Sequence, residues 1–337
     1  MKKINFAIIG CGQISSKHID AVLHSKHAQL VAVADAVPSR VREVSKELHI
    51  EGYVDYHQLL ANPVVDVVNI CTPSGLHTEM AVAAAKAGKH VILEKPMALV
   101  TKDAKKIITA FKKSKTTLSL MFQNRYNRAI QFVKEREKRL GRLNYITAQV
   151  YWYRNQNYYN NIWRGTRAMD GGVLTNQGSH YADLVLYFKK KPITKISAFG
   201  ATLGHKIECE DVITVNLTFS DGSIGNIQAN TITYPSNYEG SLTLFYDRAT
   251  IKIGGSALNK IVYWKGDFEN EIHKIHTKHI EKICENGHRK VIQNMTNHLL
   301  GLEPLFIPGI AGVGPVHLIE NAYLSMKTGR VINLNNI

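Results

Sequence analysis

The sequence predicts an α/β protein with two domains: a doubly wound parallel sheet, then an α+β domain with an open, mostly antiparallel sheet. Three observations lead to this prediction. The chain has 337 residues, about twice the length of one typical domain. Strand-like and helix-like segments alternate over its first third, as in a parallel sheet covered by helices. Residues 194–264 instead alternate strands and turns. We place the two domains at residues 1–122 and 123–337.

The individual elements follow from the hydrophobic pattern. Short apolar runs bounded by glycine or polar residues indicate buried strands, and longer amphipathic stretches indicate helices. The predicted strands of the first domain are 4–9, 30–34, 65–70, 90–93 and 117–121, with helices at 76–87 and 102–113. The second domain is predicted to contain a helix at 126–139, a strand at 143–153, a hairpin at Asp221-Gly222 and a helix at 315–327.

Composition restricts the class of protein. A content of 45% hydrophobic and 20% charged residues supports a globular core, and no apolar run approaches the roughly 20 residues that cross a bilayer. The net charge of +15 favours an anionic small-molecule partner. The basic residues are spread along the chain without interleaved aromatic residues, so we expect no nucleic-acid partner. Four cysteines without CxxC pairs fit a reducing, cytoplasmic location.

The first predicted strand runs into a glycine-rich turn that opens a helix. Gly10 allows the tight turn, and Gly12 lets the backbone approach a pyrophosphate at the helix N-terminus. Ser15 replaces the third glycine of the dinucleotide fingerprint and is small enough for close packing. Gln13 and Ile14 complete the phosphate-binding turn. This pattern predicts a Rossmann fold that binds a dinucleotide.

The second predicted strand ends in Asp35, 23 residues after Gly12. An acidic residue here can accept hydrogen bonds from the adenosine ribose of NAD, whereas it repels the 2′-phosphate of NADP. No arginine follows directly, although Arg40 is not far away. We therefore expect NAD rather than NADP.

The segments after the other strands should gather at the same edge of the sheet, where ligands of doubly wound folds bind. They resemble a known family. Residues 71–77 (Cys-Thr-Pro-Ser-Gly-Leu-His) and 87–96 (Ala-Gly-Lys-His-Val-Ile-Leu-Glu-Lys-Pro) are similar to the motifs of the glucose–fructose oxidoreductase/inositol dehydrogenase (Gfo/Idh/MocA) family. The resemblance implies an NAD-dependent sugar dehydrogenase. It further implies that the nicotinamide half of the cofactor is flanked by Thr72, Pro73, His77, Glu94, Lys95 and Gln123.

Lys95 is the predicted catalytic residue of the first domain. Beside a cationic nicotinamide, burial and like charge both disfavour its ammonium form, so it can hydrogen-bond the substrate hydroxyl and share its proton. The bond to Pro96 is a candidate cis peptide.

His180 is the predicted catalytic residue of the second domain. It lies four residues after Asn176 in a predicted helix, so both side chains should share one face. A histidine can accept the hydroxyl proton during hydride transfer. The family usually has aspartate where this chain has Asn176, and an amide relays no proton. His180 would therefore act alone or with Lys95, and Asn176 would orient the sugar.

The aromatic and arginine-rich segment before this helix resembles bacterial UDP-N-acetylglucosaminuronate 3-dehydrogenases. By resemblance, the substrate is a UDP-linked acetamido uronic acid of cell-surface polysaccharide synthesis (O-antigen, lipopolysaccharide), oxidised at its C3 hydroxyl. Arginine suits its carboxylate and diphosphate. The predicted substrate residues, besides Lys95, Asn176 and His180, are Arg125, Tyr153, Arg154, Trp163, Arg164 and Thr166, and Arg167 is a further candidate.

Alternatives stay open at this stage. The substrate could be a free or phosphorylated sugar or inositol, oxidised with NAD(P), or the fold could serve as a non-catalytic nucleotide sensor. His273, His276 and His279 are spaced by three residues, but we expect them on a solvated helix face, and no metal is predicted. An uncovered apolar face of the second sheet would suit a homodimer or homotetramer.

Overall fold

The computed structural model describes residues 2–255, 257–271 and 286–334. The chain divides into two compact units. The first unit consists of Met1–Gln123 and Asn286–Val313, and the second of Asn124–Glu285 and Gly314–Ile337. The late segment Asn286–Val313 thus belongs to the unit that the chain builds first. The sequence predicted two consecutive domains, 1–122 and 123–337, and did not indicate that residues 286–313 belong to the first unit. The predicted histidine triplet at 273, 276 and 279 lies outside the described residues.

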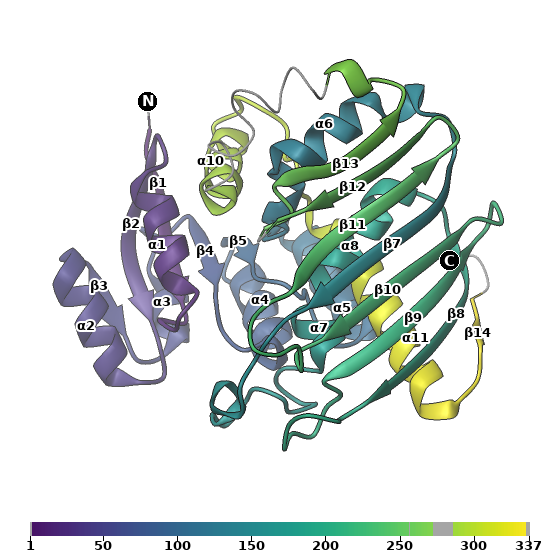
Figure 1. Ribbon diagram of the computed structural model, residues 1–337. Coiled ribbons are helices and arrows are strands. Elements are labelled where there is room, and N and C mark those ends of the chain that lie inside the picture. The colour runs from purple at the N-terminus through teal and green to yellow at the C-terminus, as the bar shows by residue number, and fades with distance from the viewer. Residues whose placement is uncertain (1, 256, 272–285, 335–337) are drawn as a thin grey trace. The chain divides into compact units, whose positions relative to one another are not determined.

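The first unit contains a six-stranded parallel sheet in the order β3-β2-β1-β4-β5-β6 (Figure 1). Its strands are β1 (Ile4–Ile9), β2 (Ala28–Ala34), β3 (Glu51–Tyr53), β4 (Val67–Ile70), β5 (His90–Leu93) and β6 (Leu118–Leu120). From β1 the sheet grows outward in one direction through β2 and β3, and then in the other direction through β4, β5 and β6. Doubly wound folds bind dinucleotides at the point between β1 and β4 where this change occurs. The predicted parallel Rossmann sheet is confirmed; the short β3 had not been predicted.

The first unit also contains the following helices, of which α1 to α5 lie between its strands in the sequence. They are α1 (Ser15–Leu23), α2 (Pro38–Leu48), α3 (Tyr56–Ala61), α4 (His77–Lys86), α5 (Thr101–Ser114) and α10 (Gly287–Leu299), with 3₁₀ turns η1 (Ser74–Leu76), η2 (Gln123–Tyr126) and η6 (Gly309–Gly312). The late helix α10 packs on α1. Arg289 of α10 binds Asp20 of α1 through both carboxylate oxygens, with Nε–Oδ2 at 2.8 Å and Nη2–Oδ1 at 2.7 Å. This salt bridge is partly exposed and adds to the packing of α10, whose buried residues include Val291, Ile292 and Met295.

The second unit is built on an eight-stranded sheet in the order β13-β12-β11-β7-β10-β9-β8-β14. Its strands are β7 (Leu143–Tyr151), β8 (Ile193–Ala201), β9 (Val212–Phe219), β10 (Ile224–Asn230), β11 (Glu239–Tyr246), β12 (Ala249–Gly254), β13 (Lys260–Gly266) and β14 (Ile332–Asn333). Only β7 and β10 run parallel; every other pairing is antiparallel. The predicted turn at Asp221-Gly222 connects β9 to β10, and the open, mostly antiparallel sheet is confirmed.

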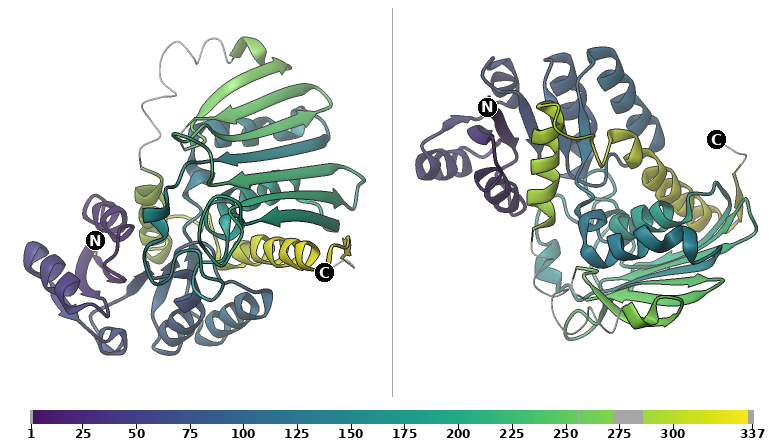
Figure 2. Two further views of the ribbon diagram at one scale, coloured as in Figure 1. Left: turned by 60° about the horizontal axis from the view of Figure 1, so that its bottom comes forward. Right: turned by 90° about the horizontal axis from the view of Figure 1, so that it is seen from above.

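Helices cover one face of this sheet. They are α6 (Arg128–Arg136), α7 (Val173–Asn176), α8 (Ser179–Lys189) and α11 (Val313–Thr328), with 3₁₀ turns η3 (Glu137–Arg139) and η4 (Gln156–Tyr159). Figure 1 shows α6, α8 and α11 behind the strands, and Figure 2 shows them along one side of the sheet. Apolar residues of α6, α8 and α11 join the inward side chains of the strands in one buried core.

The opposite face of the sheet is mixed rather than uniformly apolar. Tyr145 stacks on Phe245, and Phe199 is 69% exposed. The polar residues Thr147 and Gln149 alternate with the buried residues of β7 and so lie on the same face as Tyr145. Assembly of the protein through this face stays a prediction.

Across the described residues, none of the helices has the length and apolar character needed to span a membrane.

Candidate active site

The glycine loop and the acidic residue after β2 are joined by a direct hydrogen bond. The Asp35 carboxylate accepts from Cys11 N at 2.7 Å through Oδ2 and from Val37 N at 2.8 Å through Oδ1. Its partner Arg40 lies 3.8 Å away. Asp35 is therefore fixed at the end of β2, beside the loop that follows β1, where the sequence predicted the ribose site.

The two glycines of the loop have different surroundings. Gly10 has φ +98°, and a Cβ atom there would lie 2.9 Å from the carbonyl group of Cys71. Gly10 is thus required by the fold itself. At Gly12, a Cβ atom would meet no protein atom within 4 Å. The backbone at Gly12 is open to a ligand, which fits the close approach of a pyrophosphate at the start of α1.

The loops after β4 and β5 are held together by His77. Its ring is buried, with Nδ1 2.7 Å from Pro96 O and Nε2 3.0 Å from Thr72 O. Burial lowers the pKa of His77, whereas the hydrogen bonds to the two carbonyl oxygens act in the opposite direction. Because both nitrogens face backbone carbonyls, His77 holds the loops carrying Thr72 and Lys95 in place. Its contact with a cofactor stays a prediction. The Lys95–Pro96 bond is cis, as predicted.

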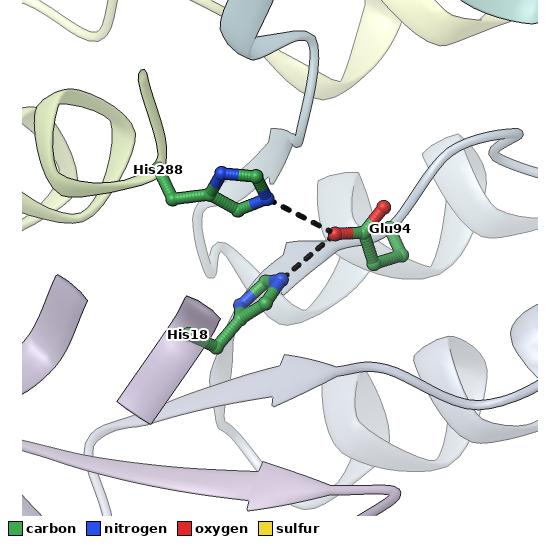
Figure 3. A group of neighbouring side chains, drawn as sticks. All are labelled: His18, Glu94 and His288. Atoms are coloured by element: carbon green, nitrogen blue, oxygen red, sulfur yellow. Dashed lines mark hydrogen bonds and ion pairs between the residues drawn. The ribbon is translucent and has the colours of Figure 1, made fainter. Parts of the chain in front are cut away.

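Glu94 lies in a buried cluster with two histidines from distant parts of the chain (Figure 3). Its Oε1 is 2.8 Å from His18 Nε2 on α1 and 3.8 Å from His288 Nε2 on α10. Burial by itself would raise the pKa of Glu94, but the hydrogen bond and charge of His18, with smaller effects of His288 and Lys95, lower it to about 2. Glu94 is therefore ionised directly before Lys95. Burial lowers the pKa of His288 to about 4, so that ring is neutral at pH 7.

This cluster is also the group of described residues that could share a metal ion, since its ligand atoms lie within 4.8 Å of one another. Metal ligands in a tetrahedral site are roughly 3.3 Å apart, given metal–ligand bonds of about 2.0 Å. His18 and Glu94 are closer than that and form a direct hydrogen bond. The arrangement is a buried hydrogen bond between His18 and Glu94, with His288 3.8 Å away on the other side of the carboxylate oxygen.

In the second unit, the predicted helix around His180 is divided into the short α7 and the longer α8. Between residues 171 and 180, every residue is buried except Asn176 and His180. The helix is interrupted at Gln177 and Gly178, between these two residues. That Asn176 and His180 share one face and bind a substrate stays a prediction.

A buried carboxylate lies directly behind Asn176. Asp170 is 3% exposed, and its Oδ1 accepts from Asn176 Nδ2 at 2.6 Å. Its Oδ2 accepts from Gly165 N at 2.8 Å. Asp170 thus links Asn176 to the loop that contains Trp163, Arg164 and Thr166. No role had been predicted for this aspartate from the sequence.

A second buried acid supports the start of α7. Glu210 Oε1 accepts from Leu174 N at 3.2 Å and from the Tyr323 hydroxyl at 2.9 Å. Burial, assisted by the charge of Asp170, raises the pKa of Glu210 to about 7, although its hydrogen bonds act in the opposite direction. A Cβ atom at Gly172 would lie 1.8 Å from this carboxylate, so a larger residue there would force the Glu210 side chain to move.

Two of the predicted substrate arginines converge on one aromatic ring. The guanidinium carbon of Arg164 lies 4.2 Å from the centre of the Tyr158 ring, and that of Arg154 lies 5.2 Å from it. Arg154 also donates to Tyr153 O at 2.6 Å. Two cations at one ring make a positively charged, partly exposed surface suited to an anion. Tyr158 was not predicted from the sequence.

Arg125, another predicted substrate residue, has a strong partner inside its own unit. Its Nε and Nη2 donate to Asp183 at 3.0 and 2.5 Å, and both residues are buried. Its guanidinium also lies 4.7 Å from the Tyr187 ring. This bidentate salt bridge gives Arg125 a structural role, and contact with a substrate stays a prediction.

The remaining predicted site residues fall on the expected elements. Those of the first unit all follow the carboxyl ends of β1, β2, β4, β5 or β6, namely Gly10, Gly12, Gln13, Ile14, Asp35, Thr72, Pro73, Glu94, Lys95 and Gln123. The residues that sequence reasoning missed are His18, His288, Tyr158, Asp170, Glu210 and Tyr323. His18 and His288 meet Glu94, and Glu210 meets Tyr323, across distant parts of the chain. Tyr158 and Asp170 contact residues only four to six positions away, in an irregular segment that no periodic pattern describes.

Comparison with known proteins agrees with this geometry. Residues 4–122 match the oxidoreductase family with an NAD-binding Rossmann fold, and residues 129–252 match the GFO/IDH/MocA C-terminal domain. The chain is 33% identical to the WlbA dehydrogenase of Bordetella pertussis, covering 99% of this chain and 98% of that one, with a TM-score of 0.94. The chain belongs to the GFO/IDH/MocA family.

Further similar proteins fall into two groups. The WlbA dehydrogenase of Chromobacterium violaceum is 33% identical, over 99% of this chain and 97% of that one, with a TM-score of 0.92. Both WlbA structures hold NADH and UDP-GlcNAcA. The myo-inositol 2-dehydrogenase of Thermotoga maritima is 28% identical over 233 residues, or 66% of this chain and 67% of that one. The protein is therefore an NAD-dependent oxidoreductase, and its first unit is an NAD-binding Rossmann domain.

Proposed function

We propose that this protein oxidises the C3 hydroxyl of a UDP-linked N-acetylglucosaminuronate to the 3-keto sugar, with NAD as hydride acceptor. One observation carries the choice of an anionic sugar: Arg154 and Arg164 meet at Tyr158 on a loop that Asp170 ties to Asn176. The anion-binding and sugar-orienting groups thus belong to one connected structure. The full-length similarity to two dehydrogenases that bind UDP-GlcNAcA supports the same choice.

The proposed mechanism assigns separate tasks to the two units. Asp35 and the loop at Gly12 hold the cofactor, which when bound takes the hydride from the carbon of the alcohol. Lys95 hydrogen-bonds the hydroxyl oxygen, and its loop is held by Glu94 and His77 from behind. His180 receives the hydroxyl proton at a ring nitrogen, so that the alcohol loses one hydride and one proton.

A substrate panel followed by NADH absorbance tests this proposal. We expect turnover of UDP-GlcNAcA and little or none of UDP-GlcNAc, which lacks the carboxylate. Replacing Lys95 or His180 by alanine should lower turnover by roughly 10²- to 10⁴-fold without loss of NADH binding. The exposed Lys46 of α2 is the control, and K46A should behave as wild type. Normal turnover by both active-site variants would overturn the assignment.

A second candidate is oxidation of a free sugar or an inositol. The inositol and sugar dehydrogenases among the curated relatives favour it. Turnover of myo-inositol or an unlinked sugar, with none of UDP-GlcNAcA, would select this candidate. Tight NADH binding without oxidation of any sugar would instead support a nucleotide-sensing protein.

A further inference from the structure

We propose that His205 is a positioning residue for Arg154, and that its ring acts as an imidazolium bound between the Asp211 carboxylate and the Arg154 carbonyl oxygen. The inference rests on the proposed function in one respect, because it takes Arg154 as a ligand of the anionic substrate. It adds a residue that acts through Arg154 and for which the sequence predicted no role.

The protonation state of His205 follows from its two neighbours. Ring Nδ1 lies 2.9 Å from Asp211 Oδ2, and ring Nε2 lies 2.8 Å from Arg154 O. An ionised carboxylate and a peptide carbonyl only accept hydrogen bonds, whereas a neutral imidazole has a single N–H group. A neutral ring would therefore turn a lone pair toward one of these oxygens. With both nitrogens protonated, the ring donates to both.

Asp211 is the fixed end of this contact. Its side chain is fully buried, and that of His205 is 5% exposed. Backbone N–H groups of Gly204 and His205 donate to Oδ2 at 2.8 and 2.9 Å, and that of Leu203 donates to Oδ1 at 2.7 Å. Together with the ring, these groups give the carboxylate four donors. The positive ring is thus paired with a buried anion, as a buried charge requires.

The other end of the ring holds the backbone of Arg154. On its opposite side, Arg154 N donates to Thr231 O at 2.9 Å, and Thr231 N donates to Asp211 O at 2.9 Å. Arg154 is therefore held through its N–H by Thr231 and through its carbonyl by His205. Both contacts lead back to Asp211. This closed set of hydrogen bonds fixes the backbone from which the Arg154 side chain extends.

His205 also supports the part of the chain where the two arginines meet. Its ring centre lies 4.8 Å from that of Tyr159. Tyr158, the preceding residue, has the guanidinium groups of Arg154 and Arg164 beside its ring. Removing the imidazolium should therefore loosen the anion-binding side chains and leave the proposed proton-handling residues in place.

Replacing His205 by glutamine tests the role in kinetics. The single NH₂ group of the amide can reach Asp211 or Arg154 O but not both, because these lie at opposite edges of the ring. We expect KM for UDP-GlcNAcA to rise about ten-fold, since one buried oxygen loses its donor, and kcat to change less than about two-fold. The Kd for NADH should stay unchanged. The exposed Lys195 of β8 is the control, and K195A should match the wild type. An unchanged KM in H205Q, or a loss confined to kcat, overturns the proposal.

A measurement without substrate separates this inference from the proposed function. In protein labelled with ¹⁵N-histidine, the NMR signals of His205 are those missing from H205Q. We expect two ring N–H groups on His205 at about pH 7, where an unperturbed histidine is mostly neutral. A single ring N–H group there overturns the inference, whatever the substrate.

Limited digestion with trypsin tests whether His205 holds the chain in the absence of a sugar. Trypsin cleaves after arginine, and the bond between Arg154 and Asn155 contains the carbonyl group that His205 binds. We expect several-fold faster cleavage there in H205Q, because this bond must leave its hydrogen-bonded position to enter the protease. H205N replaces H205Q if the latter lacks a cooperative urea transition.

The two substrate-free results decide the inference by themselves. Equal cleavage rates overturn it. Faster cleavage together with two ring N–H groups supports it even if UDP-GlcNAcA is not turned over, and in that case only the proposed function fails.

Discussion

Replacing Glu210 by glutamine should change the pH dependence of stability of the second unit. The side chain keeps its shape, and its carbonyl oxygen can still accept from Leu174 N and the Tyr323 hydroxyl. What disappears is a carboxyl group whose pKa in the folded protein is raised from 4.5 to about 7, chiefly by burial. The E210Q substitution therefore removes one titratable group and keeps the two hydrogen bonds accepted by the side-chain oxygen.

The sign and size of the expected stability change follow from the linkage between proton binding and folding. A group with a raised pKa stabilises the folded state fully below its unfolded pKa, and this contribution is lost as pH rises through the folded pKa. The wild type should therefore lose stability relative to E210Q between pH 4.5 and about 8. Each pKa unit corresponds to about 1.4 kcal/mol, so the relative loss is about 3 kcal/mol.

Tryptophan fluorescence during urea unfolding is the appropriate assay. All three tryptophans, Trp152, Trp163 and Trp264, belong to the second unit, so the signal reports the unit that contains Glu210. Glu208 is the matched control, because its carboxylate is half exposed and E208Q should follow the wild-type profile. If E210Q and wild type show the same pH dependence, Glu210 titrates normally and the reasoning from its burial is wrong.

Three further predictions concern other parts of the molecule. In R125M the buried Asp183 carboxylate loses its partner, which should destabilise the second unit by about 3–5 kcal/mol, and R125M/D183N should recover part of this loss in urea unfolding. G10A should fold poorly, because its Cβ atom would meet backbone and φ is positive, whereas G12A should fold normally and bind NADH more weakly, as measured by calorimetry. Equal thermal stability of G10A and G12A would contradict the claim that the fold requires glycine at position 10 but not at position 12. D35S should weaken NADH binding and improve NADPH binding, and a fluorescence titration that shows no change in their ratio would refute the role of Asp35.

The first unit could be predicted in most respects because its signals are local. Each apolar strand carries its own ligand-binding turn, so the glycine loop, Asp35 and the Glu94-Lys95-Pro96 segment were assigned without knowing which strands are neighbours. Parallel connection then brings all strand ends to one edge of the sheet. The return of α10 was not predictable, since it packs on a helix far away in the sequence, and residues that meet there, such as Arg289 and Asp20, are 269 positions apart.

In the second unit the sequence alone determined which residues could handle a sugar and a proton: Asn176, His180 and the arginines near residue 160. Only the tertiary structure decided which side chains within the protein these residues contact. It paired Arg125 with Asp183, placed Asp170 behind Asn176, and turned Arg154 and Arg164 toward Tyr158. There are two physical reasons. Arg125 and Asp183 meet across 58 residues, and residue spacing carries no record of such a contact. The other contacts are only four to six residues apart, but they form in an irregular segment whose backbone conformation no periodic pattern specifies.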